Sequence, residues 1–426
     1  MADVEIASSA TPEEREHQRS GLKLLSVELD KWSPIGPEKI TLDIADRRTV
    51  LIGRNGAGKS ALIDGILLGL DDSLRGPRIG PRGFKAKFED AEGKRIVYEH
   101  SWEPVPQDPT ETAKLLAEGQ EAGQQWAERC WYEGSEDKPL WSMKDGRAFI
   151  GEREIAVPEH GSVPTASFSK GIDTIVVDPA YDLRRKWFTG FCSFAKRVDA
   201  GIPHAREPRD GAHERTDQIY FYKQKKTSEA ATTEEPKWTL LAKMPRRFTR
   251  VFSKIFQWSR EDAETGYFSE LRELGRRIGA FQEFEIPIMV LPDGGSFAQV
   301  VLDGENAGNA ADGTLRLVEI LYAMLRVGPG SIMLLEEPET GVHPGALISL
   351  LNVLDSYAVD RQFLLSSHSP VVIGQVKPEE LRIVYRREGQ THVRPLDASE
   401  LDRAASFLSQ EGTLDEFMLS GAIDES

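Results

Sequence analysis

The stretch "RTVLIGRNGAGKSALIDGILLGL", from Arg48 to Leu70, decides the fold of this chain. It begins as a short apolar run typical of a buried strand and ends with the apolar spacing of a helix. Between the two, "GRNGAGKS" has glycine, lysine and serine at every fixed position of the pattern G-x-x-x-x-G-K-S. A strand, a glycine-rich loop and a helix in this order predict an α/β domain.

The glycine-rich loop predicts a nucleotide site. Glycines let backbone N–H groups turn toward phosphate oxygens, and the start of the following helix adds the positive end of its dipole. We expect Lys59 to reach the β- and γ-phosphates of ATP, and the Ser60 hydroxyl to bind Mg²⁺. The loop residues predicted to bind ATP are Gly53, Arg54, Asn55, Gly56, Ala57, Gly58, Lys59, Ser60 and Ala61.

A second stretch, "SIMLLEEPETGVHP" from Ser331 to Pro344, ends an apolar run in two carboxylates. A proline follows them, so the strand stops with Glu336 and Glu337 at its tip. Taken alone, the stretch is more simply a strand that runs out into a polar loop. Next to a bound triphosphate, however, Glu336 can hold the metal through its water shell and Glu337 can polarise the attacking water.

A third stretch, "QFLLSSHSP", is a buried-looking strand with His368 at its end. A lone histidine is usually structural. Here it follows the carboxylate strand and its crossover helix, which can bring it beside the γ-phosphate. We therefore predict that Lys59, Glu337 and His368 are catalytic and that Ser60 and Glu336 bind the metal.

Composition indicates a globular protein of more than one structural unit, with 426 residues, 39% hydrophobic and 29% charged. No stretch approaches the roughly 18 apolar residues of a membrane span, and the N-terminus is polar and acidic, so we expect a cytoplasmic protein without a membrane partner. Cys130 and Cys192 are too few for a disulfide framework and lack zinc-ligand spacing.

The charge is unevenly distributed. The net charge of −16 argues against nonspecific DNA binding, but residues 184–260 hold 18 Lys/Arg against 8 Asp/Glu. Aromatics crowd this basic window, as in "RRKWFTGFCSFAKR" and "MPRRFTRVFSKIFQWSR". That mixture fits a nucleic acid whose bases stack on the aromatics. It equally fits helices that pack aromatics inward, or a dock for an acidic partner.

Patterning divides the chain into four segments. Residues 1–20 read as a disordered tail, and residues 21–180 as a first lobe with the glycine-rich loop and an antiparallel β subdomain. That subdomain includes a helix expected over "ETAKLLAEGQEAGQQWAER". Residues 181–285 form the basic, mostly helical insertion, interrupted by the mobile loop "KKTSEAATTEEPK". Alternating β and α patterns over residues 286–426 predict a second lobe with a mostly parallel sheet.

Together, "GRNGAGKS", "ADGTLRLVEILYAML", "MLLEEPETGVHP" and "LLSSHSP" resemble the ABC-type ATPases of the SMC, RecF and OLD group. They are particularly similar to AAA-type members of bacterial anti-phage systems such as Septu, PARIS and retron-linked modules. The resemblance implies an ABC-type P-loop head with a helical insertion, and a head-to-tail dimer or higher homo-oligomer that sandwiches ATP. The signature loop that faces ATP of a second subunit would be Ala311, Asp312, Gly313 and Thr314; Asp312 also fits an ordinary helix N-cap.

The chain departs from that group at three places. Glu336 replaces the usual metal-binding aspartate, and Ala311 replaces the signature serine, so turnover is expected to be slow. No glutamine marks the Q-loop, for which "VVDPAYD" (176–182) is the candidate segment. Trp32 could stack on adenine or be a buried tryptophan.

The resemblance favours an ATP-dependent switch or scaffold that senses phage infection and controls a separate nuclease or toxin. One alternative is a RecF-like repair ATPase that binds DNA through residues 184–260. Another is a nucleotide-gated assembly scaffold with little turnover, for which Ala311 is the best support.

Overall fold

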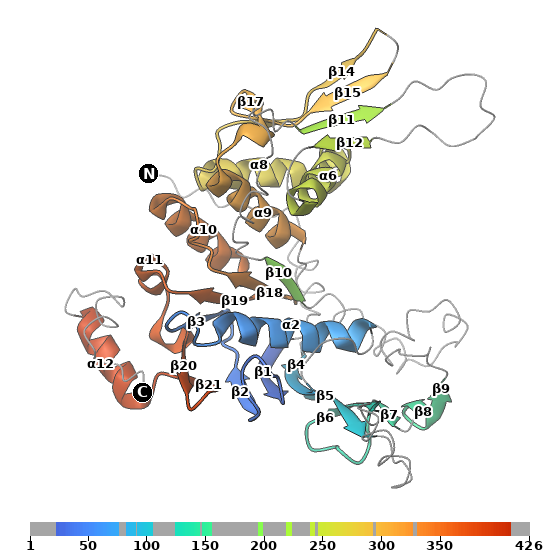
Figure 1. Ribbon diagram of the computed structural model, residues 1–426, viewed down its shortest axis with the longest axis vertical. Coiled ribbons are helices and arrows are strands. Elements are labelled where there is room, and N and C mark those ends of the chain that lie inside the picture. Colours follow the sequence, from blue (N-terminus) through green and yellow to red (C-terminus); the bar gives the residue numbers. More distant parts are fainter. Residues whose placement is uncertain are drawn as a thin grey trace, which may run out of the picture. The chain divides into compact units, whose positions relative to one another are not determined.

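The chain folds into two units that alternate along the sequence (Figure 1). A computed structural model describes residues 23–75, 82–90, 92–104, 124–144, 147–155, 195–198, 219–223, 239–242, 246–292, 295–326 and 330–409. Unit 1 comprises Met1–Arg197, Val327–Glu336 and Tyr357–Ser426, and unit 2 comprises Val198–Arg326 and Glu337–Ser356. The expected tail, the Q-loop candidate, the "KKTSEAATTEEPK" loop, Arg184, Arg185 and Cys192 lie outside the described residues.

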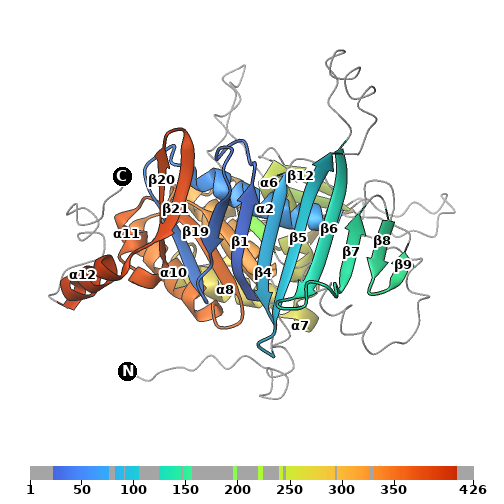
Figure 2. The same ribbon diagram turned by 90° about the horizontal axis from the view of Figure 1, so that it is seen from below.

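An eight-stranded antiparallel sheet forms one layer of unit 1 (Figure 2). Its strand order is β2-β1-β4-β5-β6-β7-β8-β9, and every neighbouring pair is antiparallel. Side chains alternate along these strands, so that one face is apolar and buried. The strands are β1 (Lys23–Asp30), β2 (Ile40–Asp43), β4 (Gly83–Glu89), β5 (Arg95–Pro104), β6 (Gln124–Tyr132), β7 (Trp141–Lys144), β8 (Arg147–Ile150) and β9 (Arg153–Ile155).

A six-stranded, mostly parallel sheet has the order β10-β18-β19-β3-β20-β21. Strands β18, β19, β3 and β20 run parallel, and β21 returns antiparallel to β20. Every residue of β3, β18 and β19 is buried, as expected for parallel strands covered on both faces. The strands are β3 (Arg48–Ile52), β10 (Ala195–Val198), β18 (Ile332–Glu336), β19 (Gln362–Ser367), β20 (Leu381–Arg387) and β21 (Gln390–Pro395).

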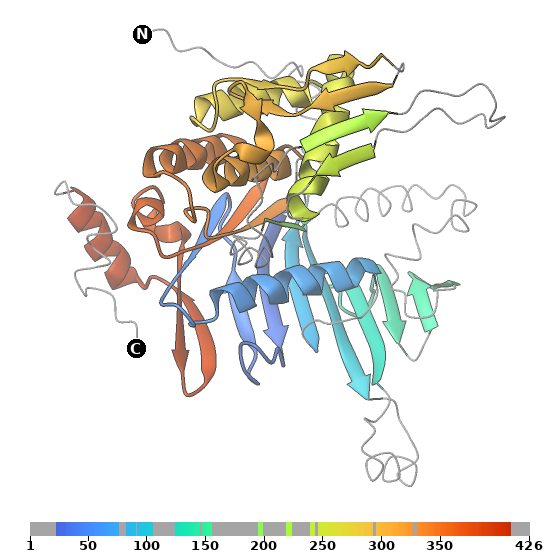
Figure 3. The same ribbon diagram turned by 45° about the horizontal axis from the view of Figure 1, so that its top comes forward.

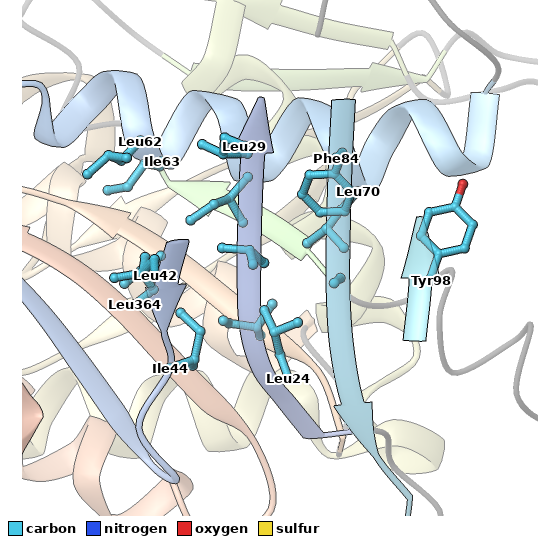
Figure 4. Packing of buried hydrophobic residues seen from close by; sticks show 14 of the residues in the cluster. Leu24, Leu29, Leu42, Ile44, Leu62, Ile63, Leu70, Phe84, Tyr98 and Leu364 are labelled. Carbon is cyan, nitrogen blue, oxygen red and sulfur yellow. The ribbon is translucent and has the colours of Figure 1, made fainter. Parts of the chain in front are cut away.

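Helix α2 (Lys59–Arg75) joins the two sheets into one core (Figures 3 and 4). Its apolar side chains Leu62 and Ile63 belong to the same buried cluster as Phe84 of the antiparallel sheet and Leu364 of the parallel sheet. Gly69 allows the helix to lie against the sheet, because a Cβ there would be 2.1 Å from the Phe84 ring. The glycine-rich loop thus leads from a buried strand into a buried helix.

Other short elements of unit 1 follow the parallel strands. They are α11 (Pro370–Ile373), the 3-10 helix η2 (Pro378–Glu380) and α12 (Ala398–Ser409).

Unit 2 contains two small sheets and a group of helices. The strand orders are β12-β11-β15-β14 and β13-β16-β17. Its strands are β11 (Ile219–Lys223), β12 (Thr239–Ala242), β13 (Phe284–Glu285), β14 (Ile288–Val290), β15 (Ser296–Gln299), β16 (Val301–Leu302) and β17 (Glu305–Asn306). Its helices are α6 (Arg246–Arg260), α7 (Asp262–Thr265), α8 (Tyr267–Arg277), η1 (Ala307–Asn309), α9 (Asp312–Arg326) and α10 (Pro344–Tyr357), whose last residue returns to unit 1.

The predicted α/β class is confirmed, with a mostly parallel sheet and an antiparallel β subdomain. One local prediction was wrong. The end of "ETAKLLAEGQEAGQQWAER" is strand β6, which pairs with β5 along its whole length. In the insertion, helices α6, α7 and α8 make up most of the described residues, and the short strands β10, β11 and β12 precede them. Among the described residues, no helix combines the length and apolar character that a membrane crossing requires.

Candidate nucleotide site

Three parallel strands of unit 1 end side by side, and each end carries a predicted functional group. In the register of the sheet, Glu336 of β18 lies opposite Ser366 of β19, which lies opposite Leu51 of β3. The glycine-rich loop starts immediately after β3, and His368 follows β19 by one residue. The carboxyl edge of this sheet therefore brings together the loop, Glu336 and His368.

Two glycines of the loop are required by close packing. Gly53 has φ +152°, and a Cβ on it would lie 2.0 Å from the Val384 main-chain oxygen. Gly58 has φ +110°, and a Cβ there would lie 2.4 Å from Thr391 Oγ1. The loop is thus pressed against β20 and β21, and any side chain at these positions would displace it.

Lys59 is directed back over the loop that precedes it. Its Nζ donates to the main-chain oxygens of Gly53, at 2.7 Å, and Arg54, at 3.2 Å, and the residue is only 6% exposed. Because α2 begins at Lys59, the first N–H groups of the helix lack partners within the helix. The loop therefore combines a lysine ammonium with a helix N-terminus, and both groups favour the binding of phosphate oxygens.

Residues distant in sequence hold the loop from behind. The hydroxyl of Thr391, a fully buried residue of β21, donates to the Ala57 oxygen at 3.0 Å. The Thr391 N–H donates to the main-chain oxygen of Ile35, in the turn between β1 and β2, at 2.8 Å. The neighbouring Gln390 accepts from the Glu38 N–H in the same turn, at 3.2 Å. Nothing in the local pattern of β21 distinguishes Thr391 or Gln390, so neither could be identified from the sequence.

Trp32 packs on α2. Its indole Nε1–H donates to the Ala61 oxygen at 2.8 Å, and a Cβ on Gly65 would lie 3.0 Å from the indole ring. This favours the packing role over adenine stacking, the other role considered for Trp32.

Glu336, the last residue of β18, and Glu337, which follows it, differ in burial and in backbone conformation. Glu336 is 6% exposed, whereas Glu337 is half-buried and belongs to unit 2. Glu337 has φ +39°, a left-handed conformation that is costly for a side-chain-bearing residue and that concentrates at functional sites. A turn stabilises it: the Thr340 N–H donates to the Glu337 oxygen at 3.0 Å, and the Thr340 hydroxyl donates to Glu337 Oε2 at 3.4 Å.

The predicted signature loop opens α9 in unit 2. Leu315 N–H donates to the Ala311 oxygen at 3.1 Å, so Ala311 occupies the N-cap position and Asp312 is the first helical residue. The cap role considered for Asp312 was therefore wrong. Gly313 packs against the turn that follows Glu337, because a Cβ on it would lie 2.2 Å from the Gly341 oxygen. Ala311 and Asp312 are exposed.

His368 is exposed at the end of β19, beside a short turn in which Ser369 N–H donates to Ser367 Oγ at 3.0 Å. Among the described residues, no group of three or more His, Cys, Asp or Glu side chains could hold a metal ion. Mg²⁺ does not require a cluster of three protein ligands, since it is usually bound by one or two protein oxygens together with substrate phosphates and water. Ser60 and the buried Glu336 carboxylate fit that requirement.

The described end of the basic window packs its aromatics inward. In α6, Phe252 is fully buried, Phe256 is 5% exposed and Trp258 is 9% exposed, whereas Lys254 and Arg260 are exposed. Of the explanations considered for this window, α6 supports a helix with solvated charges. Its buried aromatics are not placed to stack on bases.

Comparison with protein families gives one match. Residues 197–374 match the family described as "AAA domain, putative AbiEii toxin, Type IV TA system". The matched segment contains Ala311–Thr314, Glu336, Glu337 and His368, and it begins after the glycine-rich loop. With that loop, the match supports a nucleotide-binding fold of the ATPase type. No match was found among curated protein sequences.

Solved SMC head domains are similar to the chain at low identity. The SMC head domain from Thermotoga maritima is 13% identical, with 88% of this chain and all of that chain covered and a TM-score of 0.40. An Smc head with extended coiled coil bound to the C-terminal domain of ScpA, derived from Pyrococcus furiosus, is 11% identical. That comparison covers 92% of this chain and 99% of the other, with a TM-score of 0.40. The fold assignment rests on the strand order and register described above.

Proposed function

We propose that this chain is a Mg²⁺-dependent ATPase that works as a nucleotide-controlled switch. The observation that carries the proposal is the register of the parallel strands, in which Glu336 lies opposite Ser366 and Ser366 opposite Leu51, shortly before His368 and the glycine-rich loop. Ligands of open α/β sheets bind at this edge. The family match over residues 197–374 supports the same activity.

Each residue has a chemical task in this proposal. The loop N–H groups and Lys59 bind the phosphates, which requires Lys59 to exchange the Gly53 and Arg54 oxygens for phosphate oxygens. Ser60 and Glu336 hold Mg²⁺, which neutralises charge on the phosphate oxygens. Glu337 orients the attacking water, and its left-handed backbone is consistent with a side chain held in place for chemistry.

The switch requires a second copy of the chain. Ala311 and Asp312 are exposed at the start of α9, where they can contact ATP bound to another copy. A nucleotide that touches both subunits stabilises only the closed dimer, so ATP shifts the population toward it. Ala311 offers no hydroxyl to the γ-phosphate, which is consistent with slow turnover. We propose that the closed state controls a separate effector protein, such as a nuclease or toxin.

The first test is the solution mass of the Glu337→Gln protein with and without ATP and Mg²⁺, measured by light scattering. ATP should convert monomer to dimer because the variant binds ATP but does not hydrolyse it. The control is Lys59→Ala, which should stay monomeric. A mass that is the same with and without ATP would refute the nucleotide-driven switch.

The second test is turnover. Wild-type ATP hydrolysis that disappears in Glu337→Gln supports an enzyme. If the wild type binds ATP but shows no hydrolysis beyond the Glu337→Gln background, the nucleotide-gated scaffold is the correct function instead.

A further inference from the structure

Ser366 carries a buried hydroxyl that bonds to none of the described residues. The residue is 1% exposed, and its Oγ has no hydrogen-bond partner in the described part of the chain. A buried hydroxyl without a partner destabilises a folded protein, and alanine would fill the same place without that cost. Such a group is therefore a candidate for binding something other than the protein.

Its position relates it to the nucleotide site. Ser366 lies opposite Glu336 in the parallel register, so both side chains leave the sheet on the same face. Two residues earlier in each strand, Leu334 and Leu364 belong to the core cluster that also contains Leu62 and Ile63 of α2. Leu364 is labelled in Figure 4. Ser366 and Glu336 consequently lie on the α2 face, at the sheet end where that helix and the glycine-rich loop begin.

We propose that Ser366 is a positioning residue for the Mg²⁺ ion that Glu336 and Ser60 hold. A water bound to Mg²⁺ acts as a hydrogen-bond donor, because one of its lone pairs binds the metal and the cation withdraws charge from its oxygen. The Ser366 hydroxyl supplies an acceptor, as the Glu336 carboxylate does beside it. This inference rests on the proposed function and adds a residue to the metal's water shell.

The chain contains a matched control at the opposite end of the same sheet. Ser331 is also 1% exposed, and its Oγ likewise has no partner within the described residues. It directly precedes β18, about 16 Å from Glu336 at the rise of a parallel strand. Replacing either serine by alanine removes the same buried hydroxyl, but only Ser366 adjoins Glu336.

The experiment compares wild type, Ser366→Ala and Ser331→Ala by ATP titration, once with Mg²⁺ and once with EDTA. Ser366→Ala should weaken ATP binding about 5- to 10-fold with Mg²⁺, the effect of one lost hydrogen bond, and leave binding in EDTA unchanged. Ser331→Ala should match wild type in both titrations. Without nucleotide, both alanine variants should melt at or above the wild-type temperature.

Three results would overturn the inference. Ser366→Ala could bind Mg²⁺-ATP as tightly as Ser331→Ala does. It could lose the same affinity with Mg²⁺ and with EDTA, or melt below wild type without nucleotide, either of which would mean that the hydroxyl supports the strand. Failure of the proposed function has a separate signature: wild type and Lys59→Ala would then bind ATP equally poorly, and the role of Ser366 would fall with it.

Discussion

The amino and carboxyl ends of the parallel sheet both bury polar side chains, but they use them differently. At the amino end, Arg48 donates to Glu380 Oε2 from Nε at 3.3 Å and from Nη2 at 3.1 Å. Gln362 exchanges hydrogen bonds with the main chain of Leu24, at 2.7 and 2.9 Å. These groups tie neighbouring segments of unit 1 together.

At the carboxyl end, Lys59 donates to main-chain oxygens of its own loop, and Glu336 is buried at a strand terminus. The Ser366 Oγ, also buried there, has no hydrogen-bond partner among the described residues. We therefore expect the polar groups at the amino end to stabilise the fold and those at the carboxyl end to bind the ligand. Variants at the two ends should therefore separate stability from nucleotide affinity.

The largest effect is expected at the amino end. Glu380→Ala leaves the 5%-exposed Arg48 as a buried charge without its carboxylate, which should lower the free energy of unfolding of unit 1 by roughly 3–5 kcal/mol. Denaturant titration measures this loss, and ATP affinity of the still folded protein should not change. The counterpart is Glu336→Gln, which should lose Mg²⁺-dependent ATP affinity with little change in stability. Equal ATP weakening in both variants would show that the two ends are not separable.

Local pattern was sufficient for the elements that build the site. Strands β3, β18 and β19 contain the consecutive apolar residues VLI, IMLL and FLL, and the apolar period of α2 and α9 is clear. The local pattern led to a wrong prediction at β6, where Ala, Glu and Gln favour a helix but nine residues pair with β5. There tertiary pairing overrides intrinsic propensity.

Contacts between distant residues could not be predicted. Thr391 reaches Ala57 across more than 300 residues, and a single sequence contains no signal for such a pair. The role proposed for Ser366 could not be predicted either, because it depends on the burial of the side chain and on its register opposite Glu336, which the sequence does not show.

The next effect concerns a buried group at neither end of the parallel sheet. His100 of β5 is buried, and loss of solvation lowers its pKa to about 4, although its bond to the Gly69 oxygen at 3.0 Å acts in the opposite direction. The unfolded chain, with an ordinary histidine pKa near 6.5, therefore takes up the proton first. Stability should be complete above about pH 6.5 and fall by about 3 kcal/mol as the pH drops to about 4.

The comparison that isolates His100 is unfolding from pH 7 to pH 4 in wild type and in His100→Gln. The amide of Gln can still donate to Gly69 but does not titrate. The Glu128 carboxyl, which lies opposite His100 in the register and accepts from the Tyr98 hydroxyl at 3.2 Å, is present in both proteins. If both proteins lose stability in parallel, His100 is not the acid-sensitive group.

A smaller effect tests the packing of the glycine-rich loop. Gly53→Ala places a Cβ 2.0 Å from the Val384 oxygen, so the loop must shift and ATP affinity should fall about 30-fold, or about 2 kcal/mol. Gly389→Ala is the control, because Gly389 has φ +82° but nothing within 4 Å of its Cβ position. That control should lose about 1 kcal/mol of stability and no ATP affinity. Similar ATP binding in the two variants would mean that loop placement against β20 is unimportant.

The smallest effect separates the Thr391 hydroxyl from its methyl group. Thr391→Val keeps the shape but removes the donor to the Ala57 oxygen, so ATP affinity should fall about 5-fold, or about 1 kcal/mol. Thr391→Ser keeps the donor and loses the methyl group that packs near Gly58, so it should melt earlier yet bind ATP like wild type. Isothermal titration should therefore show the weaker ATP binding in Thr391→Val, and thermal melts should show the lower melting temperature in Thr391→Ser. If affinity follows melting temperature in both, Thr391 contributes only packing, and the loop's conformation is set by its own glycines and by Lys59.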